Sequence, residues 1–88
     1  MAVAERSSGK HKPHVVRDPQ VLGGEPTVRG TRISVRSVVL AAREYGGADG
    51  VRTAYPHLEP EAIAEALADY ESHRKEVDRY IRENLADA

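Results

Sequence analysis

Two arginines and a threonine stand close together at Arg29, Thr31 and Arg32, in a stretch rich in glycine and β-branched residues. A guanidinium group presents a planar fork of N–H donors that fits a phosphate or a carboxylate, and a threonine hydroxyl adds one more donor. The spacing therefore predicts an anion-binding turn. The candidate DNA-binding residues are Arg17, Arg29, Thr31, Arg32 and Arg36, with Lys10 and Lys12 on a flexible arm before them.

The basic residues are concentrated in the first part of the chain. Residues 1–36 hold seven Lys/Arg against three Asp/Glu, a balance of +4, whereas residues 37–88 hold six against eleven, a balance of −5. A basic segment favours phosphates through counterion release, and an acidic one is repelled by them. Two alternatives stay open: the charges form two solvated faces, or Arg32 is a structural arginine that bonds a helix carboxylate such as Glu44 or Glu61.

A β-hairpin is expected to hold this turn in place. Glycines that tolerate positive φ, a proline and β-prone residues fill positions 23–35. Val15-Val16 and Val21-Leu22 are short apolar segments separated by Asp18-Pro19, and such a strand could pair with residues 27–28 or 32–33. An unpaired edge of this small sheet would let two copies join.

Three helices are expected after the hairpin. Ser34 is a suitable cap for the first, and Gly46-Gly47 ends it. Asp49 is the expected cap of a shorter second helix that ends at Pro56, and Pro60 suits the first turn of the third. The predicted fold class is mainly α: an N-terminal β-hairpin or short strands, then a homeodomain-like, helix-turn-helix three-helix bundle with a long C-terminal helix.

The third helix is a poor candidate for reading DNA, because its carboxylates would weaken binding to phosphates. It has no Gly or Pro after Pro60 and is expected to run for about 26 residues, or about 40 Å. So small a domain covers only part of that length, and an apolar stripe beyond His73 is expected to need a groove. That groove belongs to a different protein or to a second copy, unless the end is frayed and solvated. The candidate partner-binding residues are Arg74, Val77, Arg79, Ile81, Arg82 and Leu85.

Composition limits the class of protein. The 88 residues include no Phe, Trp or Cys, so a single thin core and an oligomer are expected, and disulfides and thiolate metal sites are excluded. No nucleophile elbow or phosphate-binding glycine loop is present, so an enzyme is not predicted, and neither a metal nor a cofactor is expected. The hydrophilic start predicts a cytoplasmic protein without a membrane span. The expected layout is a disordered tail at 1–12 and one domain at 13–88, divided into a hairpin arm (13–34), a three-helix core (35–73) and a C-terminal extension (74–88).

Residues 23–35 resemble the motif G-G-x-P-x-[IV]-x-G-T-R-[IL]-x-V of a bacterial GTRI-motif family, which is catalogued as a domain of unknown function (DUF433-like) and treated as VapB-type antitoxins. The similarity covers roughly residues 15 to 77, since Tyr55-Pro56-His57-Leu58 and the helix from Glu61 to Tyr70 also follow that family's pattern.

The resemblance implies the antitoxin of a type II toxin–antitoxin pair. Its N-terminal part would dimerise and bind operator DNA, and its C-terminal helix would occupy a PIN-like ribonuclease toxin. In this hypothesis the apolar stripe anchors the helix, and one of three arginines, Arg74, Arg79 or Arg82, reaches the acidic metal site of the nuclease. The alternative is a stand-alone DNA-binding transcriptional regulator or homodimeric scaffold with no toxin.

Overall fold

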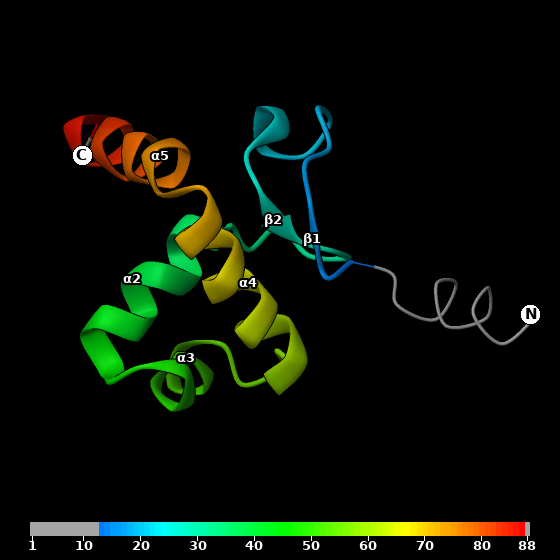
Figure 1. The fold of residues 1–88 in the computed structure, drawn as a ribbon, viewed down its shortest axis with the longest axis vertical. Coiled ribbons are helices and arrows are strands. Elements are labelled where there is room, and N and C mark those ends of the chain that lie inside the picture. The colour runs from blue at the N-terminus through cyan, green and yellow to red at the C-terminus, as the bar shows by residue number, and fades with distance from the viewer. Residues whose placement is uncertain (1–12, 88) are drawn as a thin grey trace, which may run out of the picture.

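The computed structural model describes residues 13–87, so the tail expected at 1–12 lies outside the described part. Within this range the chain forms strands β1 (Val15–Val16) and β2 (Thr27–Val28), followed by four α-helices. The helices are α2 (Val35–Tyr45), α3 (Ala48–Ala54), α4 (Pro60–Ser72) and α5 (Arg74–Asp87). Helix α4 lies between the small sheet and the pair formed by α2 and α3 (Figure 1). The predicted mainly helical class, with short N-terminal strands before a helical bundle, is confirmed.

The two strands form one antiparallel ladder. Val15 lies opposite Val28, and Val16 lies opposite Thr27. The prediction of a strand at residues 21–22 is wrong, because residues 22–24 form a 3-10 turn. In this turn Leu22 has a φ of 51°, and the φ angles of the two glycines after it are also positive. Three successive left-handed residues reverse the chain here, which an extended strand cannot do.

The outer edge of β1 is closed at its start by a side chain of α4. The Glu65 Oε2 atom accepts hydrogen bonds from the amides of His14, at 2.8 Å, and Val15, at 3.1 Å. The Val15 amide is one of the donors that a further strand would need. Two copies were expected to join along an unpaired edge of the sheet. At His14 and Val15, the amides are already bonded to Glu65 and are not free for such pairing.

Most helix ends follow the expected signals. The Ser34 Oγ atom accepts a hydrogen bond from the Ser37 amide at 2.9 Å, and Gly46 ends α2 in the left-handed region with a φ of 94°. Pro60 lies in the first turn of α4, as predicted. The predicted cap of α3 is wrong, because Gly47 occupies the cap position and Asp49 lies inside the first turn.

Helix α3 contains a glycine whose place is dictated by packing. Gly50 is buried, and a Cβ atom at this position would collide with the backbone carbonyl of Tyr45 at the end of α2. Glycine inside a helix is unfavourable by about 1 kcal/mol relative to alanine. The close approach of α2 and α3 requires it nevertheless.

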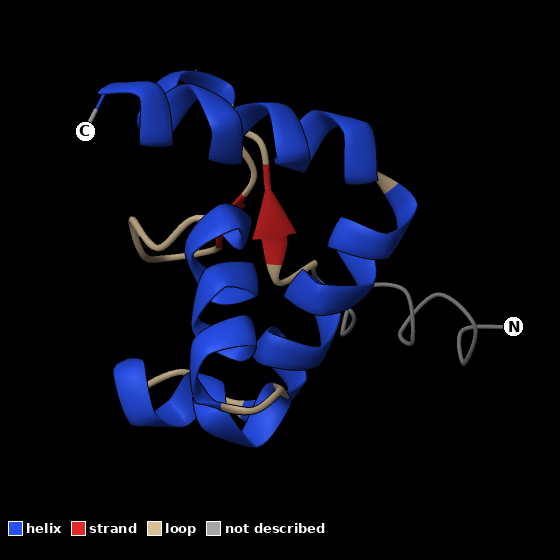
Figure 2. Ribbon diagram, turned by 90° about the vertical axis from the view of Figure 1, so that its left-hand side faces the viewer, coloured by secondary structure: helices blue, strands red, loops and turns tan. Residues whose placement is uncertain are grey.

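The long C-terminal helix of the prediction is broken. Helix α4 ends at Ser72, His73 has a non-helical conformation with φ −134° and ψ 42°, and α5 starts at Arg74. The chain changes direction at this point, so that α5 crosses the end of the bundle (Figure 2). The reason is tertiary, since the bend packs α5 against α2.

The core is built mainly from valine, alanine and isoleucine. Val38, Val51 and Val77 have no exposed surface, and Ile63 is 2% exposed. Helix α5 therefore supplies part of the core instead of extending beyond it. None of the helices between residues 13 and 87 has the length and the apolar content needed to cross a bilayer.

Candidate functional site

The predicted anion-binding turn is rigidly closed. The Val28 amide donates to the Ile33 carbonyl at 2.8 Å, and Thr27 forms an antiparallel bridge with Ser34. The Thr31 hydroxyl donates to the Val28 carbonyl at 2.8 Å and accepts from the Ile33 amide at 2.9 Å. The Thr31 hydroxyl therefore holds the turn together, and its hydrogen is not available to an anion.

The two arginines of this turn are exposed. The Arg29 Nε atom donates to the Pro13 carbonyl at 2.7 Å, which directs the side chain. Its terminal nitrogens have no bonded partner among the groups described in residues 13–85. Arg32 forms no ion pair within the described part of the chain, so the alternative that it is bound to Glu44 or Glu61 is wrong. Arg29 and Arg32 are therefore the available cations of the turn.

A shallow hollow of about 270 Å³ lies between this turn and the start of α4. Its wall combines an arginine and two imidazoles with one carboxylate over an apolar floor. Such a surface offers more donors than acceptors and suits an anionic group. The lining residues are His14, Val28, Arg29, Thr31, His57, Leu58, Glu59 and Ala62.

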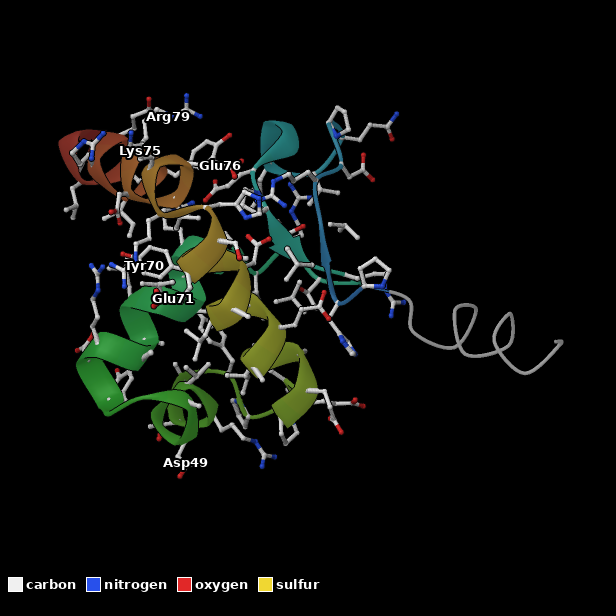
Figure 3. All side chains as sticks on the ribbon, viewed as in Figure 1. Asp49, Tyr70, Glu71, Lys75, Glu76 and Arg79 are labelled. Atoms are coloured by element: carbon white, nitrogen blue, oxygen red, sulfur yellow. The ribbon has the colours of Figure 1, made fainter. Side chains whose placement is uncertain are left out.

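Two carboxylates hold Arg17 within the fold. Its guanidinium contacts Asp69 on α4, with Nη2 to Oδ2 at 3.1 Å, and Glu76 on α5, with Nη2 to Oε1 at 2.7 Å. The Glu76 hydrogen bond raises the pKa of Arg17, and the same bond lowers the pKa of Glu76. Glu76 lies on the side of α5 that faces the segment between the strands (Figure 3). Arg17 therefore ties the helices on both sides of His73 together, and its guanidinium is already bonded to two carboxylates.

Arg36 is likewise occupied. Its Nε atom donates to Glu25 Oε2 at 2.7 Å and its Nη2 atom to Oε1 at 3.2 Å. The Glu25 side chain is 6% exposed and the Arg36 side chain 19%. This bidentate pair has a buried carboxylate and anchors the segment before β2 to α2, so Arg36, like Arg17, is already bonded within the fold.

The apolar stripe of the C-terminal helix is mostly inside the molecule. Val77 is fully buried and Ile81 is 7% exposed, whereas Leu85 is 66% exposed. The expectation that all three lack partners within the fold is wrong for the first two, because the bend at His73 places them on the core. Leu85 alone remains as an exposed anchor.

The arginines of α5 differ in how firmly they are held. Arg74 bonds Glu71 at 2.8 Å and lies over the Tyr70 ring, 5.0 Å from its centroid. Arg79 lies on the outer side of α5 (Figure 3) and makes a loose contact of 3.8 Å with Glu83. Arg82 is exposed and has no ion pair with the side chains described in residues 13–85. Of the predicted partner-binding cations, Arg82 is the most available.

A polar cluster around Tyr70 was not predicted. The Tyr70 hydroxyl donates to Asp78 at 2.9 Å and accepts from Arg43 at 3.0 Å, which joins α4 to α5 and α2. Tyr70 is 7% exposed. Its polar end needs a partner when buried, but no spacing rule names residues from two other helices as that partner.

Two of the histidines, His14 and His73, pair with carboxylates. His14 Nδ1 lies 3.0 Å from Glu65 Oε1, and His73 Nδ1 lies 3.3 Å from Asp69 Oδ1. No group of three or more ligand-type side chains converges in the described residues. These histidines therefore have structural partners, and the site that remains for function consists of the exposed turn arginines and the end of α5.

The Glu65 carboxylate gives a prediction about acid stability. Burial raises its pKa, but the hydrogen bonds from the His14 and Val15 amides and the His14 imidazole outweigh burial and hold the pKa below its ordinary value of 4.5. A lowered pKa in the folded state adds stability above the unfolded pKa, and this stability is lost as the pH falls through the folded pKa. Glu65→Gln does not titrate, so its unfolding free energy should decline less between about pH 5 and about pH 2.

Urea unfolding across this pH range measures the effect. Glu61→Gln is the matched control, because Glu61 lies one turn earlier on α4 and is exposed. It should follow the wild-type curve. If the unfolding free energy fell equally steeply with pH in the wild type and in Glu65→Gln, the lowered pKa of Glu65 would be contradicted.

Both the sequence and the fold of this chain are similar to those of a known protein family. A family model described as "Protein of unknown function (DUF433)" matches residues 15–70. No curated protein matches the chain. The crystal structure of a DUF433 member protein from Anabaena variabilis ATCC 29413 superposes with a TM-score of 0.71 and 28% identity, over 92% of this chain and 80% of that one. The family match covers more than half of the chain and includes both strands, helices α2 and α3, and α4 up to Tyr70, and the chain therefore belongs to the DUF433 family of proteins of unknown function.

Proposed function

We propose that the protein is the antitoxin of a type II toxin–antitoxin pair, which acts in the cytoplasm as a dimer, binds operator DNA and neutralises a PIN-like ribonuclease. The observation that carries this proposal is the contrast between its arginines. Arg17 and Arg36 are held by carboxylates, whereas Arg29 and Arg32 are exposed on a closed turn. A rigid turn loses little conformational freedom on binding, so its two cations are well suited to phosphate contacts. In this proposal the chain has no catalytic activity.

Removal of the two turn arginines should weaken DNA binding in a salt-dependent way. If each contacts one phosphate, Arg29→Ala with Arg32→Ala makes the negative slope of log K against log salt shallower by about two units. The measurement is a binding titration on a duplex from upstream of the protein's own gene, at several salt concentrations. Arg29→Lys with Arg32→Lys preserves both charges and should keep the slope.

A second control removes two other exposed arginines, Arg52 and Arg79, which lie on α3 and α5. An unchanged slope in the folded Arg29 and Arg32 double variant would exclude the phosphate role of the turn.

The end of α5 is the proposed toxin-binding surface. Leu85 is an exposed apolar anchor, and Arg82 is an exposed cation one helical turn before it. Residues three apart lie on the same face of a helix, so the pair presents an apolar group beside a positive charge. An acidic metal site of a nuclease would attract that charge.

Toxin capture tests this surface. Tagged full-length protein should recover a small PIN-like nuclease from its native cells, identified by mass spectrometry, and Arg82→Ala with Leu85→Ala should lose it. A truncation at His73 is a poor variant, because it removes the core residues Val77 and Ile81. Arg52→Ala is the control and should retain the nuclease. Equal recovery by the double variant would contradict the assignment to the end of α5.

A second candidate is a stand-alone DNA-binding regulator or homodimeric scaffold with no toxin. The burial of Val77 and Ile81 favours it, since the stripe expected to bind a partner is used within the fold. Recovery of no nuclease, together with a normal salt slope on DNA, would select this candidate.

A further inference from the structure

Helices α4 and α5 are separated by a single residue in a stretch that has the composition of one helix. Residues 61–88 contain neither glycine nor proline. His73 is the break, and it has an ordinary side chain in a non-helical conformation. Sequence preference alone would make this stretch continuous. The bend is therefore imposed by contacts elsewhere.

The bend interrupts the backbone hydrogen bonding of the helix. The His73 amide donates to the Asp69 carbonyl at 2.9 Å, and helical bonding resumes where the Val77 amide donates to the His73 carbonyl at 3.0 Å. The amides of residues 74–76 fall in the first turn of α5, where a helix offers no internal acceptor. In a continuous helix these amides would bond to the carbonyls of residues 70–72.

Three contacts hold α5 in its bent position. Val77 and Ile81 are buried in the core. Arg17 bonds Glu76 of α5 together with Asp69 of α4, and the Tyr70 hydroxyl bonds Asp78. Each of these contacts requires that an α5 helix occupies this position. The α5 helix of a second copy of the chain would satisfy them equally well.

We propose that two copies of this chain exchange α5. In the exchanged dimer, residues 60–87 form one continuous helix, and the α5 segment of each copy packs against α2 of the other. Glu76 of one copy then accepts the hydrogen bonds of Arg17 from its partner. The dimer keeps the contacts of α5 and gains the helical hydrogen bonds that the bend removes. Exchange of an identical element is a route to dimers that needs little new interface.

The inference concerns self-association and does not depend on a toxin or on DNA. In this proposal, the face of α2 that α5 covers is an interaction surface. It binds the α5 helix of a second copy of the chain. At the start of β1, the His14 and Val15 amides are already bonded to Glu65 of the same chain.

The hinge residue allows a matched test. His73→Ala favours the continuous helix, and His73→Gly disfavours it, while neither carries a side chain that contacts Asp69. Two hinges straighten per dimer, so the dimer dissociation constant should be on the order of tenfold lower for Ala than for Gly. Sedimentation equilibrium on full-length wild type and both variants measures it. Monomers of wild type and His73→Ala at all concentrations would overturn the proposal, as would equal constants for the two variants.

Chemical cross-linking distinguishes exchange from any other dimer. The chain has no cysteine, so Arg17→Cys and Glu76→Cys can be placed in it without interference. The two single variants are mixed at high concentration, allowed to exchange partners and treated with a short bismaleimide. A covalent dimer that joins position 17 to position 76 is expected. In the variant that carries both cysteines, a link confined to single chains within the dimer fraction would overturn the exchange.

Discussion

Arg36→Met is expected to destabilise the fold by about 3 kcal/mol, because it leaves the Glu25 carboxylate buried without its partner. Glu25 is 5% exposed and accepts both of its ion-pair hydrogen bonds from Arg36. Removal of one member of a buried pair leaves an uncompensated charge, whereas neutral groups of similar volume in place of both are tolerated. Glu25→Gln with Arg36→Met should therefore recover most of the loss. Urea unfolding of the two single variants and the double variant measures the coupling.

The control for these three variants is Arg52→Met, which changes an exposed arginine on α3. Its unfolding free energy should stay within about 0.5 kcal/mol of the wild-type value. A loss of similar size in Arg36→Met and Arg52→Met would mean that the Glu25 pair does not anchor the segment before β2. Additive effects in the double variant would lead to the same conclusion.

Ile81→Ala should destabilise the protein by about 2 to 4 kcal/mol, since it leaves a cavity where α5 meets the core. Ile81 is 7% exposed, whereas Leu85, one turn later on the same helix, is 66% exposed. Leu85→Ala is therefore the matched control, with an expected effect below about 0.5 kcal/mol. Thermal or urea unfolding separates the two. Equal losses, or none in either variant, would show that α5 does not dock as described.

Local signals predicted the elements well. Ser34 and Gly46 mark the ends of α2, and Pro60 marks the start of α4, because caps and prolines act on neighbouring backbone groups. The failures at residues 21–22 and at Asp49 are also local. In the first, three positive φ values form a turn where apolar residues favoured a strand. In the second, a glycine took the cap position ahead of the acidic residue.

The bend at His73 could not be predicted from helical spacing. Val77, Ile81 and Leu85 recur with the same period whether α5 continues α4 or folds back. The periodicity therefore identifies the apolar face of the helix, but it does not show what that face packs against. Burial of the first two depends on docking against α2.

The arginines of the site show a similar limit. Arg17 pairs with a carboxylate 59 residues away, and Glu65 of α4 bonds an amide 51 residues away. Residue type and nearness to a turn made Arg17, Arg29, Arg32 and Arg36 equivalent candidates. Only the three-dimensional positions of the carboxylates separate the bound cations from the exposed ones.

The glycine in α3 also limits which sequences can share this arrangement of helices. Any side chain at position 50 would meet the Tyr45 carbonyl, so a relative with a larger residue there must hold the counterparts of α2 and α3 further apart. The identity of this one residue in a family alignment therefore divides members by the spacing of that helix pair. It offers a criterion for choosing templates when other members are built by homology.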